Sequence, residues 1–130
     1  MLRDHRRLRA FELSDHLVVA VYEATGKFPP HELFGLTSQL RRAAVSVPAN
    51  IVEGCGRETV NDYRHFLTVA FGSLRELGYL VDLSGRLGYL EKSTLDSLRN
   101  AHDEAARVLA ALLRGTPRRS SRQTVRPAKA

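Results

Sequence analysis

Apolar residues recur at intervals of three and four along four stretches of the chain, and this spacing predicts four helices. The stretches cover residues 8–25, 36–53, 60–87 and 94–114. The third has the most regular seam, made of Tyr63, Leu67, Ala70, Leu74, Leu77 and Val81. Short glycine-containing connections separate the stretches, and such connections favour antiparallel neighbours. The sequence therefore predicts an all-α, antiparallel up-down four-helix bundle over residues 9–114.

These helices carry more apolar surface than one bundle interior can bury. The third stretch has a second apolar row beside its seam, made of Val69, Leu80, Leu83 and Leu87. The second stretch carries Val45, Ala49 and Val52 opposite its own seam. Exposed patches of this size are unusual on a soluble monomer. We therefore expect the chain to pack against copies of itself, with cyclic closure as the soluble arrangement.

Two features of residues 36–56 depart from an ordinary helix. Pro48 lacks the N–H of a helix hydrogen bond and clashes with the preceding turn, at a cost of about 3 kcal/mol. We expect a kink there, or two helices that meet, and the seam that continues to Ile51 favours the kink. Gly54 and Gly56 predict a turn with a left-handed cap. Gly72 and Ser73 have little bulk, which suggests that the kinked segment approaches them closely.

The net charge of +6 lies at the two ends of the chain. Four of the first nine residues are arginines, and residues 115–130 hold five basic residues and no acid, whereas the body is slightly acidic. We expect residues 1–8 to form a basic arm and residues 115–130, rich in Arg, Ser and Pro, to form a disordered basic tail. Basic ends suggest a nucleic-acid partner, although they do not describe the folded body.

The composition is that of a soluble globular protein, with 43% hydrophobic and 26% charged residues. The longest apolar run, residues 17–22, is far shorter than the roughly 20 residues of a membrane span. The arginine-rich start is not followed by a signal-peptide core. We therefore expect a cytoplasmic protein without a membrane partner. The single cysteine, Cys55, excludes an intrachain disulfide.

No residue pattern predicts catalysis, a cofactor or a metal site. The five histidines form no HExxH motif and no pair four apart on a helix, and the Glu-x-x-His sets of a metal-binding bundle are missing. Cys55 lies in no motif that would activate a thiol. His102 falls in the apolar seam of residues 94–114, which favours a core role. We expect a non-enzymatic protein.

A polar stripe runs beside the seam of the second helix, at steps of three or four: Gln39, Arg42, Ser46, Asn50 and Glu53. Two interpretations stay open. The stripe makes hydrogen bonds that fix the register of helices or subunits, or it forms a surface for a ligand or nucleic acid.

Arginine is the residue best suited to phosphate contact, because its planar fork matches phosphate oxygens. The candidates for nucleic-acid binding are Arg41, Arg42, Arg57, Arg64, Arg75, Arg86, Arg118, Arg119 and Arg122. The alternative is a structural ion pair, such as Arg57 reaching back to Glu53. Arg64, Arg75 and Arg86 recur every eleven residues, which also fits a solvated outer face.

The block of residues 28–77 resembles the 23S rRNA intervening-sequence protein family, also called four-helix bundle proteins. The resemblance rests on Phe28, Pro29, Glu32, Gly35, Leu36, Thr37, Gln39, Arg41, Arg42, Ala43, Ser46, Pro48, Ala49, Asn50, Ile51, Glu53, Gly54, Gly56, Arg57, Phe66, Leu67, Gly72, Ser73, Glu76 and Leu77. It implies an antiparallel four-helix bundle that assembles as a ring-like homopentamer. The family's structural motif falls here on Gln39, Ser46, Pro48, Asn50, Glu53, Gly54 and Gly56.

The resemblance implies no established activity. Family members can be encoded within inserts in ribosomal RNA genes. A structurally similar protein, the accessory protein of diversity-generating retroelements, binds a reverse transcriptase and nucleic acid. We therefore expect a non-catalytic, oligomeric bundle that binds RNA or DNA, or a nucleic-acid enzyme such as a reverse transcriptase. The alternative is a structural or protein-interaction scaffold that binds no nucleic acid.

Overall fold

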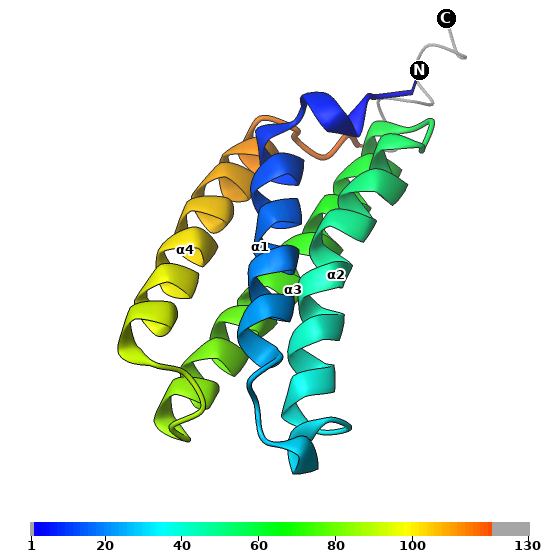
Figure 1. Cartoon of the computed structure of the whole chain (residues 1–130). Helices are drawn as coiled ribbons and strands as arrows, with labels where there is room; N and C mark the ends of the chain where they lie inside the picture. The colour runs from blue at the N-terminus through cyan, green and yellow to red at the C-terminus, as the bar shows by residue number, and fades with distance from the viewer. Residues whose placement is uncertain (1, 121–130) are drawn as a thin grey trace, which may run out of the picture.

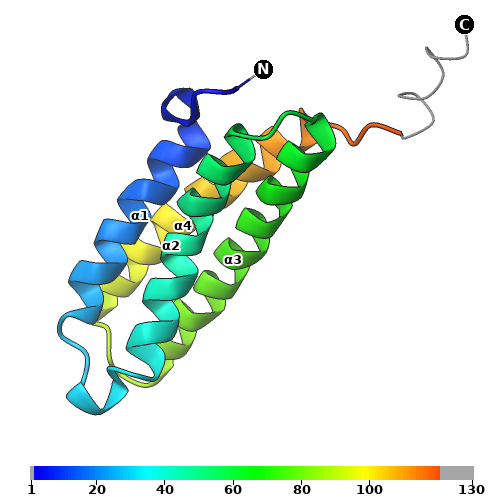
Figure 2. The ribbon, with the colours of Figure 1, turned by 90° about the vertical axis from the view of Figure 1, so that its right-hand side faces the viewer.

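The computed structural model describes residues 2–120 and contains four long α-helices. They are α1 (Arg9–Thr25), α2 (Leu36–Cys55), α3 (Val60–Arg86) and α4 (Lys92–Arg114), with short 3-10 helices η1 (His5–Arg7) and η2 (Pro30–Glu32). In Figures 1 and 2 the helices run side by side, with α1 and α3 each packed between α2 and α4. The described residues contain no strand. The predicted all-α four-helix bundle is confirmed.

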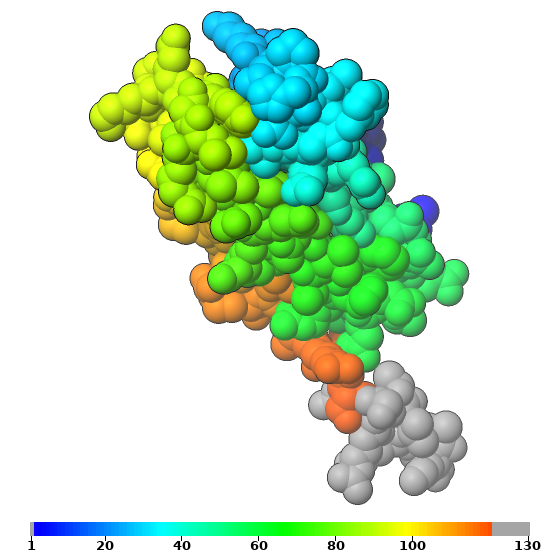
Figure 3. Space-filling model, turned by 90° about the horizontal axis from the view of Figure 1, so that it is seen from below, coloured from blue at the N-terminus to red at the C-terminus, as the bar shows by residue number. Residues whose placement is uncertain are grey.

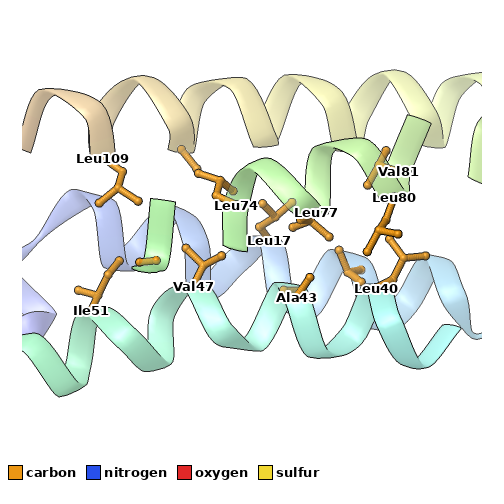
Figure 4. Packing of buried hydrophobic residues seen from close by; sticks show 14 of the residues in the cluster. Leu17, Leu40, Ala43, Val47, Ile51, Leu74, Leu77, Leu80, Val81 and Leu109 are labelled. Atoms are coloured by element: carbon orange, nitrogen blue, oxygen red, sulfur yellow. The ribbon is translucent and has the colours of Figure 1, made fainter. Parts of the chain in front are cut away.

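The core is a continuous column of aliphatic side chains contributed by all four helices. Leu17, Ile51, Leu74 and Leu109 are almost completely buried and meet between the helices (Figure 4). Every residue of the predicted α3 seam is buried. The spacing of apolar residues thus located the interior face of each helix correctly.

Part of the expected surplus of apolar surface on α3 is wrong. Leu80 is buried, and Leu83 packs against the core, because α3 contacts both α2 and α4 and so buries a wide arc. Val69 and Leu87 remain exposed. On α2, Val45 and Val52 are exposed as expected.

Helix α2 is continuous through Pro48 and through Gly54, so neither a break at the proline nor a turn at the glycine occurs. A Cβ added at Gly54 would lie 3.0 Å from Phe66 Cβ and 3.2 Å from the Tyr63 carbonyl oxygen. Gly54 is therefore small so that α2 and α3 can approach closely. The predicted left-handed cap is also wrong, because Gly56 ends the helix with φ −87°.

The glycines of α3 serve contacts with α4 rather than with α2. A Cβ added at Gly78 would lie 2.7 Å from His102 Nε2, and one at Gly85 would lie 2.7 Å from Leu95 Cδ2. Gly72 has open space where its Cβ would be, so the expected close approach there is wrong.

Both terminal segments leave the bundle at the same end (Figure 1). The backbone N–H of Arg3 donates to the Cys55 carbonyl at 3.0 Å, which ties the N-terminal arm to the end of α2. After α4, Arg64 of α3 donates to the carbonyl oxygens of Leu113 and Thr116, at 2.7 and 2.9 Å. The first residues of the expected disordered tail are thus held against α3, and residues 121–130 lie outside the described residues.

No helix in residues 2–120 combines the length and the apolar character that crossing a bilayer requires.

Candidate functional site

The polar stripe predicted on α2 lies along the outer groove between α2 and α3. Gln39, Arg42 and Ser46 line one wall of a groove of about 450 Å³, and Ser73 and Glu76 of α3 line the other. The spacing on α2 predicted the first wall. The second wall could not be placed from sequence, because it depends on how α3 is turned.

A hydrogen-bond chain crosses this groove from helix to helix. Asn50 Nδ2 donates to the Ser46 carbonyl at 2.8 Å and to Ser46 Oγ at 3.0 Å. Ser46 Oγ in turn lies 2.7 Å from Ser73 Oγ on α3. This arrangement matches the interpretation in which the stripe fixes the register of neighbouring helices. Gln39, Arg42 and Glu76 are exposed and have no such partner among the described residues.

The adjacent arginines of α2 have different surroundings. Arg41 Nε donates to Thr25 Oγ1 at 2.9 Å, and its guanidinium lies 4.6 Å from the centre of the Tyr22 ring, so it joins α2 to α1. Arg42 points into the α2–α3 groove and makes no ion pair within residues 2–120. Of the two candidates, Arg42 is the one available to a ligand.

Arg57 makes the structural ion pair that its spacing suggested. Its Nη2 lies 2.7 Å from Glu53 Oε2, and its guanidinium lies 4.7 Å from the centre of the Phe66 ring. The pair forms because α2 continues helically through Gly54, which brings Glu53 close to the residue four positions later. Both side chains are about half exposed, so the pair contributes little to stability.

The arginines spaced by eleven on α3 do not form one surface of equal groups. Arg64 is half-buried and satisfies two carbonyl oxygens at the end of α4, so it is a structural residue. Arg75 lines a shallow groove beside Gly78 and His102, and Arg86 is exposed near the end of α3. The even spacing predicted a shared face, but not the contact between Arg64 and the end of α4.

Exposed arginines without an acidic partner gather on the two terminal segments. Within residues 2–120, the side chains of Arg7, Arg114, Arg118 and Arg119 make no ion pair. Nearby, Arg6 and Arg9 do pair, with Asp4 at 3.0 Å and Glu104 at 2.8 Å. We refer to residues 3–9 and 114–119 together as the basic terminal segments.

Asn61 is a site residue that the sequence did not reveal. Its side-chain amide donates to the Arg119 carbonyl at 2.8 Å and accepts from the Arg119 N–H at 2.7 Å. This two-point contact fixes the backbone that carries Arg118 and Arg119 beside the start of α3. The candidate Arg122 lies outside the described residues. Figure 3 shows the orange segment after α4 at the opposite end of the molecule from the two loops at the other end of the bundle.

The chemistry of the remaining candidates is that of a packed interior. Burial raises the pKa of the Cys55 thiol, and the nearby Arg3 offsets this shift only in part. This direction is the reverse of that found in nucleophilic cysteines. His102 Nε2 donates to the Leu74 carbonyl at 2.9 Å, as expected for a histidine in the seam. No group of three or more metal-ligating side chains occurs in the part of the chain that the structure describes.

A sequence model of the 23S rRNA-intervening sequence protein family matches residues 6–111, which include all four helices and the α2–α3 groove. The chain belongs to this family. The match ends before the segment that carries Arg114, Arg118 and Arg119, so this part of the intervening-sequence protein lies outside the family pattern.

One solved structure is similar to this intervening-sequence protein over most of both chains. It is a protein of unknown function from the S23 ribosomal protein family of Bacteroides thetaiotaomicron, with a TM-score of 0.74 and 21% identity. The similarity covers 81% of this chain and 95% of the other. At this level of identity it shows a shared fold. A search of curated proteins gave no match.

Proposed function

We propose that this protein is a non-catalytic, self-associating helical bundle whose basic terminal segments bind RNA. The observation that carries the proposal is the gathering of exposed arginines without acidic partners where both termini leave the bundle. RNA carries a phosphate at every nucleotide, and unpaired arginines contact phosphate without first breaking an ion pair. The residues beyond 120 add Arg122, Arg126 and Lys129 to the same end of the sequence.

The fixed backbone of residue 119 supports this proposal. Arg118 and Arg119 are held next to Asn61 rather than at the end of a long linker, so less conformational entropy is lost when they bind. The α2–α3 connection nearby carries the acids Glu58 and Asp62, which confine the positive surface to the terminal segments. The family name, which refers to an insert in 23S rRNA, favours RNA over DNA as the first ligand to test.

The test compares two sets of charge removals that are equal in number. Arg114→Ala, Arg118→Ala and Arg119→Ala together should weaken binding to a structured RNA and flatten its dependence on salt by about two to three contacts. The control combines Lys27→Ala, Arg75→Ala and Arg86→Ala, which removes as many charges from other surfaces. Equal losses for both sets would contradict a localised RNA surface. Equal affinity for duplex DNA would contradict the preference for RNA.

Self-association is the second part of the proposal, and it is supported by apolar residues on the outside of the bundle. Val45 and Val52 of α2 and Val69 of α3 are each about two-fifths exposed. The family resemblance favours five copies in a ring. A scaffold that binds protein alone, or binds a nucleic-acid enzyme such as a reverse transcriptase, would use the same apolar surface. Such a scaffold would not bind free RNA.

A further inference from the structure

Phe34 is the most exposed large apolar side chain of the described residues, with 93% of its surface open to solvent. The turn that carries it is well fixed. Glu32 Oε1 accepts from the Leu36 N–H at 3.1 Å, and Glu32 Oε2 accepts from the Tyr89 hydroxyl at 2.9 Å. The Gly35 N–H also donates to the Glu32 carbonyl at 2.9 Å. A phenyl ring held outward on a rigid turn is suited to insertion into another surface, because little entropy is lost on binding.

A cleft of about 610 Å³ opens at the same end of the bundle, between the end of α1 and the start of α4. Its apolar lining comes from Ala20, Ala24, Leu90 and Leu98. The two alanines lie one turn apart on α1, and their small side chains leave the space open. An apolar cleft of this size accommodates an aromatic ring with its neighbouring residue.

The turn and the cleft lie on different sides of the bundle. In Figure 1 the cyan connection before α2 is at the right, and the start of α4 is at the left. In Figure 3 the same connection and the yellow-green start of α4 appear as separate projections. A protrusion on one side and a complementary cleft on another produce a head-to-tail contact between identical copies, which closes into a ring when the rotation permits.

The charges near the two surfaces are complementary. The α2–α3 groove, on the side of Phe34, presents Arg42 and Glu76. The cleft presents Glu23 and Lys27 at its rim. None of these four side chains has an ion-pair partner within residues 2–120. Each surface therefore offers one positive and one negative group that the opposite surface can neutralise.

We propose that Phe34 of one copy inserts into the α1–α4 cleft of the next copy, with Arg42 and Glu76 facing Glu23 and Lys27. The proposal rests on the self-association part of the proposed function and assigns its contact. It does not depend on RNA binding.

The test uses two variants that each destroy one half of the contact. Phe34→Glu keeps the cleft, and Ala20→Arg fills the cleft but keeps Phe34. Light scattering should find the wild type at several times the chain mass of 14.5 kDa, and each variant alone at the chain mass. An equimolar mixture should form a complex of two chains, because one intact Phe34 meets one intact cleft and the contact cannot continue. Tyr79→Ala, which removes a 59% exposed aromatic from the outside of α3, is the control and should keep the wild-type mass.

The outcomes separate this proposal from self-association itself. If the wild type is a multimer and Phe34→Glu has the same mass, or if the mixture forms no complex, the assigned contact is wrong and self-association stands. If the wild type is a monomer, self-association fails and the contact fails with it. Circular dichroism checks folding, and Ser97→Tyr, a change at an exposed residue of the cleft, replaces Ala20→Arg if that variant unfolds.

Discussion

The hydroxyl oxygens of Ser46 and Ser73 lie 2.7 Å apart and join α2 to α3 across their outer groove. Each single change to alanine should lower the free energy of unfolding by about 1 kcal/mol, because a partly buried hydrogen bond is lost. The double variant should lose less than the sum, by about 0.5–1 kcal/mol, since both changes remove the same bond. Urea unfolding of the four proteins measures this coupling. Strictly additive losses would contradict a register-fixing role for the pair.

Two glycines of the bundle should respond to alanine in opposite directions. Gly54→Ala should destabilise the protein by about 1–3 kcal/mol, because the new Cβ would lie 3.0 Å from Phe66 Cβ. Gly72→Ala should stabilise the protein by up to about 1 kcal/mol, since it has open space and alanine favours a helix. Thermal unfolding compares them. Stabilisation by Gly54→Ala would show that α2 and α3 are not closely packed there.

The turn that carries Phe34 should be sensitive to acid. Hydrogen bonds from the Leu36 N–H and then from the Tyr89 hydroxyl hold the pKa of Glu32 below its ordinary value. A lowered folded-state pKa gives stability that is present above about pH 4.3, the value in the unfolded chain, and is lost as the pH falls through the folded pKa. The urea midpoint of the wild type should therefore fall more steeply in this window than that of Glu32→Gln. Glu58→Gln, at an exposed acid, should behave as the wild type does, and equal pH profiles for all three would contradict the role of Glu32.

Two truncations should separate the structural part of the basic tail from its binding part. Removing residues 121–130 should leave the unfolding midpoint unchanged and weaken RNA binding in low salt, because three basic residues are lost. Removing residues 116–130 should also lower the midpoint, since Arg64 and Asn61 lose partners. Unchanged RNA affinity after both truncations would show that the tail is not the contact.

The helices were predictable because apolar spacing reports directly which face of a helix is buried. The functions of glycine were not, because one residue type serves both turns and close helix contacts. Gly54 was assigned to a turn, although it lies inside α2 where Phe66 leaves no room for a side chain. Local sequence contains no information about which residue of α3 faces Gly54.

The candidate site was predictable only where its contacts are local. Arg57 and Glu53 are four residues apart on one helix, so their ion pair followed from spacing. The contacts of Arg64 and Asn61 join the start of α3 to the chain beyond α4. They depend on the antiparallel arrangement that brings these distant segments together, and no motif indicated them.

The most direct test of the central claim is to map where RNA touches the full-length protein. Ultraviolet cross-linking to a uridine-rich structured RNA, followed by mass spectrometry of the peptides, identifies the contact residues. We predict cross-links in residues 1–9 and 110–130, which diminish when Arg114, Arg118 and Arg119 are replaced by alanine. Cross-links confined to the α2–α3 groove, or none above those of an unrelated acidic protein, would contradict RNA binding by the basic terminal segments.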